Sequence, residues 1–174
     1  MEKIKAFFSD GLIFTNMSDE SKALYDKSRF GELKRKKFYY SLLETLYLIE
    51  NNKLDVLDGK NKVIDFDKFV KKAKKLEHGF WVRYVVFRDM RSRGYILKTA
   101  LKFGADFRVY DRGIKPGEDH AKWVLYAIHE KSVLTWHEFS ARNRVAHSTR
   151  KKLLIGVVDE EHDVTYYVCN WIKP

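Results

Sequence analysis

Residues 106–128, DFRVYDRGIKPGEDHAKWVLYAI, decide the fold of the second half of this chain. Residues 106–110 and 121–128 are short apolar and aromatic runs with the length and composition of buried strands. Between them, residues 113–119 contain proline and glycine, which favour a loop over a helix or strand. The stretch therefore predicts two strands joined by a long connection.

The segments around this stretch extend the pattern into a domain. A helix is expected from about Trp136 to His147, because Thr135 can cap its first turn. Three more strands are expected, at residues 95–97, 152–158 and 164–171. Strands that alternate with a helix predict an α/β (α+β) fold with a central mixed sheet.

The first half predicts a smaller mixed α/β domain. Residues 4–8 and 12–14 flank a Ser-Asp-Gly turn and indicate a β-hairpin. Apolar side chains recur at helical spacing from Phe38 to Ile49, so a helix is expected there. A strand at residues 54–57 and a helix capped by Asp65 follow. With another amphipathic helix expected from Phe80, the predicted division is an N-terminal domain at 1–79 and a C-terminal domain at 80–174.

Composition favours a polyanionic partner. The chain of 174 residues has 34 Lys and Arg against 24 Asp and Glu, a formal charge of +10, which makes nucleic acid the first partner to consider. Cys169 is the single cysteine, so neither an internal disulfide nor a cysteine-based zinc site is expected. No run approaches the roughly 18 apolar residues that span a bilayer, and no secretory leader is evident. A cytoplasmic protein without membrane association is expected.

Three side chains of the second half suit RNA cleavage by acid–base chemistry. Cleavage through the 2′-hydroxyl needs a base, an acid and a cation for the charge that develops on phosphorus. His120 has the side chain best able to donate a proton near neutrality. Tyr110 requires a positive environment to act as a base, which Lys151 and its neighbours can supply. Alone, each is more often an ordinary residue: a packed tyrosine, a surface histidine or a surface lysine.

A succession of motifs singles these residues out, because in order and content it resembles the archaeal tRNA-splicing endonucleases. The resemblance covers most of residues 80–174, and the N-terminal half is similar in pattern. The matching segments are Arg91–Tyr95 (RSRGY), Leu101–Tyr110 (LKFGADFRVY), His120–Leu125 (HAKWVL), Arg144–Leu154 (RVAHSTRKKLL) and Val157–Tyr167 (VVDEEHDVTYY).

The resemblance implies an endoribonuclease that excises introns from precursor tRNA at bulge-helix-bulge splice sites. The expected products are a 2′,3′-cyclic phosphate and a 5′-hydroxyl, formed without a metal or other cofactor. In the family's pattern Tyr110 is the general base, His120 the general acid and Lys151 the residue that stabilises the transition state.

The resemblance also implies RNA-binding residues on the basic segment. Arg144 matches a basic position that stacks on a flipped bulge base, although an arginine near a helix end can equally serve the helix dipole. Arg142, Arg150 and Lys152 are expected to contact phosphates, which position RNA without selecting its sequence.

An acidic turn in this basic chain, Asp159, Glu160 and Glu161, implies self-association. In the family such a turn inserts into a basic cleft of a neighbouring subunit, and the C-terminal strand pairs with its counterpart. A homotetramer arranged as a dimer of dimers is therefore expected, with a heterotetramer left open.

Two alternatives remain at this point. Asp106, Asp111, Glu118 and Asp119 are close enough in sequence to suggest a magnesium-dependent nuclease, although they show no paired metal-ligand spacing. The chain could instead be a noncatalytic RNA-binding or structural subunit of a splicing endonuclease. The presence of all three candidate catalytic residues argues against that second alternative.

Overall fold

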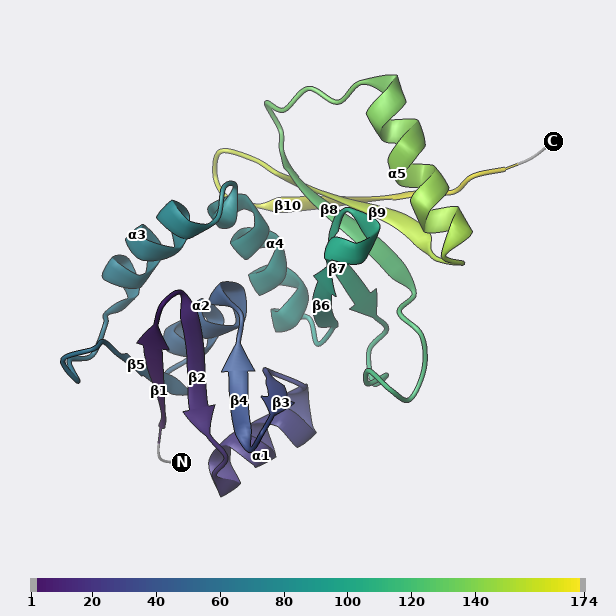
Figure 1. Cartoon of the computed structure of the whole chain (residues 1–174). Coiled ribbons are helices and arrows are strands. Elements are labelled where there is room, and N and C mark those ends of the chain that lie inside the picture. Colours follow the sequence, from purple (N-terminus) through teal and green to yellow (C-terminus); the bar gives the residue numbers. More distant parts are fainter. Residues whose placement is uncertain (1–2, 173–174) are drawn as a thin grey trace. The chain divides into compact units, whose positions relative to one another are not determined.

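The computed structural model describes residues 3–172 and divides the chain into two units, Met1–Phe80 and Trp81–Pro174 (Figure 1). Each unit contains a five-stranded sheet, with strand order β3-β4-β2-β1-β5 in the first and β10-β9-β8-β7-β6 in the second. Both sheets are mixed, since β1 pairs in parallel with β5 and β8 in parallel with β9. The predicted α/β fold class is confirmed.

The N-terminal unit begins with the predicted hairpin. Strands β1 (Ile4–Ser9) and β2 (Leu12–Asn16) pair antiparallel around Asp10 and Gly11, both of which have positive φ. The other elements of the unit are α1 (Asp19–Ser28), β3 (Glu32–Lys34), β4 (Lys37–Tyr40), α2 (Leu42–Glu50), β5 (Leu54–Leu57) and α3 (Phe66–Leu76). Of these, α1 and β3 were not predicted.

The helix expected from Phe38 to Ile49 was wrong in its first part. Phe38 lies in β4, and α2 starts only after Ser41, its N-cap. Ser41 and Glu44 form a capping box, in which the Ser41 hydroxyl accepts from the Glu44 N–H and the Glu44 carboxylate accepts from the Ser41 N–H. The same carboxylate accepts from the Gly31 N–H at 3.1 Å. This local network ends the strand and begins the helix where apolar periodicity alone continues across both.

The C-terminal unit carries its helices on opposite faces of the sheet. Its elements are α4 (Phe80–Ser92), β6 (Ile96–Ala100), the 3-10 turn η1 (Leu101–Phe103), β7 (Ala105–Tyr110), β8 (Trp123–His129), α5 (Trp136–Ser148), β9 (Lys152–Val158) and β10 (Val164–Cys169). Val86 of α4 faces Gly156, where an added Cβ would lie 3.3 Å from its methyls. Ala146 of α5 packs against Leu153, which points to the other side of β9.

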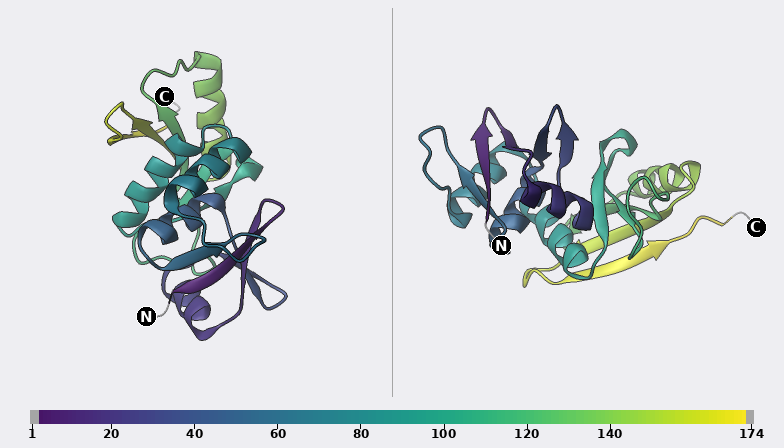
Figure 2. Two further views of the ribbon diagram at one scale, coloured as in Figure 1. Left: turned by 90° about the vertical axis from the view of Figure 1, so that its left-hand side faces the viewer. Right: turned by 90° about the horizontal axis from the view of Figure 1, so that it is seen from below.

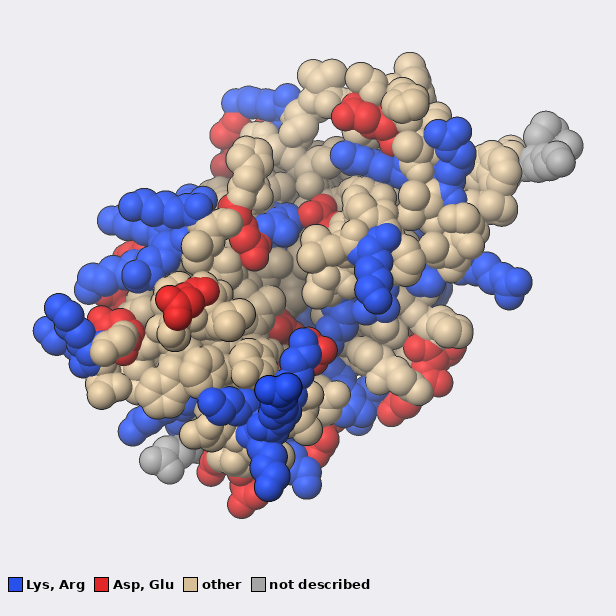
Figure 3. Space-filling view, in the orientation of Figure 1, with Lys and Arg blue, Asp and Glu red and all other residues tan. Residues whose placement is uncertain are grey.

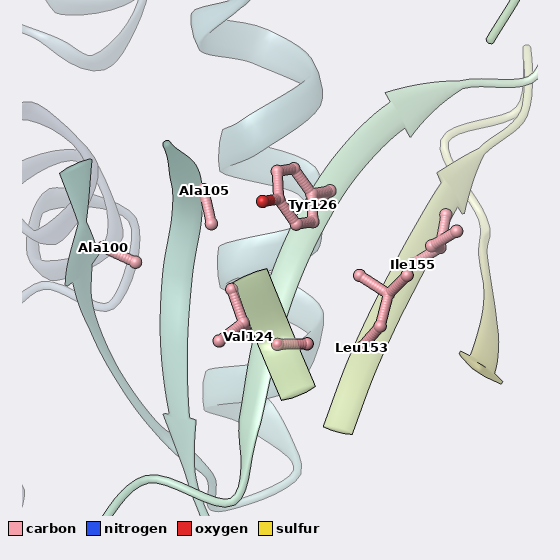
Figure 4. Close-up of a cluster of buried hydrophobic side chains, with 7 residues drawn as sticks. Ala100, Ala105, Val124, Tyr126, Leu153 and Ile155 are labelled. Atoms are coloured by element: carbon pink, nitrogen blue, oxygen red, sulfur yellow. The ribbon is translucent and has the colours of Figure 1, made fainter. Parts of the chain in front are cut away.

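The core beneath α5 fixes the alignment of the central strands (Figure 4). Its buried members are Ala100, Ala105, Val124, Tyr126, Ala146, Leu153 and Ile155. Val124 is opposite Leu153 and Tyr126 is opposite Ile155 in the parallel β8–β9 pair. A shift of one residue would turn these side chains away from α5, so burial specifies the register.

Strand β10 forms one edge of this sheet, as the views of Figure 2 show. It ends at Cys169, two residues earlier than the predicted Trp171. Tyr167 and Val168 are 55% and 50% exposed. An edge strand that exposes apolar side chains in this way can pair with another chain. No helix within residues 3–172 is long and apolar enough to cross a membrane.

Candidate active site

Strand register brings Tyr110 and Lys151 to the same end of the C-terminal sheet. Val109 is opposite Trp123, and Trp123 is opposite Lys152. Tyr110 directly follows Val109, and Lys151 directly precedes Lys152, whose N–H donates to Lys122 O, so both residues lie just beyond the same end of the paired strands. Two strand spacings separate the backbones of Tyr110 and Lys151, about 10 Å.

Tyr110 is the last residue of β7, and its side chain is held by apolar contacts. It is 6% exposed and forms a small cluster with Ile96 of β6 and Ala121. Ile114, half-buried in the connection between β7 and β8, packs against this cluster. A ring packed in this way keeps one orientation, which a group that must meet a single hydroxyl requires.

His120 is exposed and lies near the end of the same connection, three residues before β8 begins. The connection contains two hydrogen-bonded turns, Ile114 N–H to Asp111 O and Glu118 N–H to Lys115 O. Two apolar residues of the connection pack on the Tyr110 cluster: Ile114, and Ala121, which directly follows His120. The candidate base therefore contacts the segment that carries the candidate acid on both sides of the loop.

An ion pair closes the two ends of this connection. Lys122 Nζ lies 2.6 Å from Asp111 Oδ2. The hydrogen bond from Lys122, with another from the Arg112 N–H, holds the pKa of the Asp111 carboxyl below its usual value. Lys122 also lies over the Trp123 ring at 4.5 Å from its centroid. The segment that contains His120 is thus fastened at its base as well as through Ile114.

Lys151 follows α5 in a turn that orients its side chain. The Arg150 N–H donates to His147 O and the Lys151 N–H to Ala146 O, the bond pattern of a Schellman motif. Lys151 Nζ donates to Thr149 O at 2.9 Å. Partial burial, and then the charge of Arg108, lower the pKa of the Lys151 ammonium. The ammonium is poorly hydrated by comparison with a surface lysine, so it interacts strongly with an approaching anion.

Arg108 belongs to the site but was missed by the sequence analysis. It lies two residues before Tyr110 on β7 and so points to the same face of the sheet. Its Nε donates to Thr99 O at 3.2 Å, while its charge acts on Lys151. Strand alternation in FRVY was the signal that could have found it. With Lys151, it places two interacting positive charges at this end of the sheet.

The predicted RNA-binding residues differ in their surroundings. Arg144, Arg150 and Lys152 are exposed. Arg142 instead lies over the Tyr126 ring, 4.6 Å from its centroid, and among the described residues its buried Nη1 has no hydrogen-bond partner. Arg142 also acts electrostatically on Asp106, whose pKa is raised by burial. Its position inside the fold makes Arg142 less available to RNA than the other three.

The acidic turn is organised from within the chain. Asp159 Oδ1 accepts from the N–H groups of Glu161 and Asp163 at 3.0 and 2.8 Å, so Asp159 shapes the turn. Glu160 pairs with Lys131. The Glu161 carboxylate has neither an ion pair nor a hydrogen bond within the part of the chain that the structure describes. Of the three predicted contact residues, Glu161 is the one left free for another molecule.

The four carboxylates considered as metal ligands have separate roles. Asp106 accepts from the Ala127 N–H, Asp111 pairs with Lys122, and the other two accept from backbone N–H groups of their own connection. Within residues 3–172 no group of three or more His, Cys, Asp or Glu side chains is arranged to hold a metal ion.

The geometry joins a phenol, an imidazole and a half-buried ammonium at one positive sheet end. No hydrogen bond joins any two of the three side chains among the residues described. Positive charge at this end of the sheet favours the binding of a phosphodiester. These features define a candidate ribonuclease site of the acid–base type.

Comparison with known proteins agrees with this class. Residues 80–166 match the family model described as tRNA intron endonuclease, catalytic C-terminal domain, and residues 4–70 match that described as tRNA intron endonuclease, N-terminal domain. The chain belongs to the tRNA intron endonuclease family.

Similar proteins named tRNA-splicing endonuclease are found in several archaea. The protein from Thermococcus onnurineus (strain NA1) is 38% identical over 172 residues, which is 99% of this chain and 98% of that protein. The one from Pyrococcus abyssi (strain GE5 / Orsay) is 37% identical over 174 residues, 99% of each chain. That from Methanothermobacter thermautotrophicus (strain Delta H) is 35% identical over 172 residues, again 99% of each.

The Asp111–Lys122 ion pair gives the first prediction. Asp111→Asn should lower the single-turnover cleavage rate about tenfold, because freeing the base of the connection misplaces His120. The melting temperature should change little, since both partners are substantially exposed. The matched control is Asp55→Asn, which removes the exposed Lys3–Asp55 pair of the other unit and should leave cleavage unchanged. Cleavage by Asp111→Asn at the parental rate would show that the pair does not position the connection.

The turn before Lys151 gives the second prediction. Arg150 has φ 56°, a left-handed conformation that helix ends usually assign to glycine. Arg150→Gly should therefore melt about 2–4 °C above Arg150→Ala, which keeps the Cβ but removes the same charge. Both variants should bind RNA equally weakly if the guanidinium contacts phosphate. The melting temperatures are measured by thermal unfolding followed by circular dichroism. A glycine variant that melts below the alanine variant would show that the backbone at residue 150 is not strained.

Proposed function

We propose that this chain excises introns from precursor tRNA by cleaving RNA at bulge-helix-bulge junctions without a metal ion. Membership of the tRNA intron endonuclease family supports the substrate. The observation that carries the mechanism is the strand register, which sets Tyr110 and Lys151 two strand spacings apart with His120 on the connection between β7 and β8.

The proposed reaction is an internal transesterification. Tyr110 takes the proton from the 2′-hydroxyl, and the freed oxygen attacks the adjacent phosphorus. His120 gives a proton to the departing 5′ oxygen, so that the products are a 2′,3′-cyclic phosphate and a 5′-hydroxyl. Lys151 stabilises the extra negative charge on the phosphoryl oxygens. No bond in this sequence requires a nucleotide or redox cofactor.

The positive sheet end supports the role of Tyr110 as the base. A phenol has a reference pKa of about 10 and works as a base near neutrality only where positive charge favours the phenolate. Arg108 points to the same face of β7 as Tyr110, and its charge acts on Lys151, so two cations lie at this end of the sheet. Ile114 and Ala121 hold the ring against rotation.

We further propose that Arg144, Arg150 and Lys152 contact RNA, with Arg144 stacking on an unpaired base. All three are exposed around the end of α5 and the start of β9, next to Lys151. Exposed guanidinium and ammonium groups near the reacting phosphate suit backbone contacts. Arg142 is left out of this proposal because its guanidinium already lies against Tyr126.

The cleavage test uses a bulge-helix-bulge RNA in excess chelator. Cleavage with cyclic phosphate ends is expected, and a substrate with 2′-deoxy sugars at the scissile positions should bind but remain intact. His120→Ala should lower the rate by about 10²–10⁴. The control His137→Ala alters an exposed histidine on the first turn of α5 and should cleave normally.

Two results would overturn the proposed chemistry. Loss of cleavage in chelator, with recovery on addition of magnesium, would favour the metal-dependent alternative. Tight RNA binding without cleavage, unchanged in His120→Ala, would favour a noncatalytic subunit.

We also propose a homotetramer. Edge strand β10 exposes Tyr167 and Val168, which suits pairing with a second copy, and Glu161 is the carboxylate of the acidic turn free to meet a basic surface. Sedimentation equilibrium should give the mass of four chains, and Glu161→Lys should shift the assembly toward dimers. Glu130→Lys, which reverses an exposed charge outside the turn, should not. Active monomers at micromolar concentration would exclude the assembly.

A further inference from the structure

The β3–β4 hairpin of the N-terminal unit has an unusual tip. Lys34 and Lys37 are directly opposite each other in the antiparallel pair, so Arg35 and Lys36 form a two-residue turn. Their φ angles are 48° and 63°. Positive φ at both central residues is the defining feature of a type I′ turn, which favours Asn-Gly because other side chains crowd the backbone there.

Arg35 and Lys36 are therefore not the residues that a type I′ turn favours. Arginine and lysine in left-handed conformations destabilise the hairpin relative to asparagine and glycine. Both side chains are exposed, and neither has an ion pair or hydrogen bond among the residues that the structure describes. The two cationic side chains are thus held in a disfavoured backbone conformation without a side-chain partner among the described residues, although the Lys36 carbonyl accepts from the Met17 N–H.

Charge is concentrated around the same tip. Lys34, Arg35, Lys36 and Lys37 are four consecutive cations. Figure 3 shows Lys and Arg side chains gathered over the region of β3 and β4. Lys34 pairs with Glu32 and Lys37 lies over the Phe14 ring, 4.7 Å from its centroid. The flanking lysines are thus directed by partners, while the two tip residues project freely.

We propose that Arg35 and Lys36 form a phosphate-binding tip that contacts the backbone of precursor tRNA away from the cleavage site. A guanidinium presents paired donors to a phosphate, and a tight turn holds the neighbouring ammonium beside it. RNA is favoured over an acidic protein segment because the chain as a whole carries a formal charge of +10. The inference rests on RNA being the substrate, and it extends recognition to the N-terminal unit.

The test replaces the tip by the turn that it lacks. Arg35→Asn combined with Lys36→Gly removes both charges and installs the favoured I′ sequence, so the melting temperature should rise by about 2–4 °C. Binding to a bulge-helix-bulge RNA with 2′-deoxy sugars at the scissile positions should weaken about tenfold near 100 mM salt. The slope of log Kd against log salt should fall by about 1.5, the loss expected for two phosphate contacts.

The matched control removes the same charge from α3. Lys71→Gln combined with Lys75→Gln changes two exposed lysines on a regular helix, and its RNA affinity should fall less than twofold. Equal weakening in both double variants would mean a general charge effect and would overturn the tip as a site. Unchanged RNA binding with altered sedimentation would instead assign the tip to contact between copies of the chain.

Because binding is measured on an RNA that cannot be cut, this result is independent of the cleavage chemistry. Parental protein that binds this RNA but fails to cleave the all-ribose form would contradict the proposed reaction while leaving the tip testable. Parental protein that does not bind the RNA at all would overturn both.

Discussion

The parallel pairing of β8 with β9 is the constraint on which the candidate site depends. Burial of Val124 and Leu153 beneath α5 sets this register, and a slip of one residue would turn both away from the helix. The same register fixes where Lys151 lies relative to Tyr110. Hydrophobic packing in the middle of the sheet thereby sets the positions of the polar groups at its end. The polar groups themselves make too few contacts to fix these positions.

The end of the sheet combines rigid and weakly held parts. Tyr110 is packed among apolar side chains, and Lys151 leaves a hydrogen-bonded helix end. His120, in contrast, lies on an exposed connection fastened by Ile114 and by the Asp111–Lys122 pair. A packed Tyr110 and an exposed His120 suit the proposed reaction, in which RNA must first enter between them.

Backbone strain and positive charge coincide at three places among the described residues, one of which, Arg29 with φ 54°, is engaged by Asp26 and the Tyr25 ring. At the other two places, Arg150 precedes Lys151, and the pair Arg35 and Lys36 forms the tip of the β3–β4 hairpin; all three have left-handed φ angles. Glycine or asparagine would suit the backbone better at each. A common explanation is that these positions serve an anion outside the chain, so that stability is given up where it secures binding.

The sequence by itself determined the fold class and most strands, because period-2 alternation and turn residues are local signals. The candidate catalytic residues followed from the order of motifs along the chain, which is equally readable without a structure. It also identified the Thr135 and Asp65 helix caps, since each needs only a few neighbouring residues. Tertiary structure alone decided which residues share a face and which charges are already engaged. Arg142, predicted to contact RNA, lies over the Tyr126 ring, a contact that no local pattern indicates. Alternation along β7 places Arg108 on the face of Tyr110, but its charge reaches Lys151 through the pairing of distant strands. Such placements depend on register and burial, which connect residues far apart in sequence and leave no local pattern.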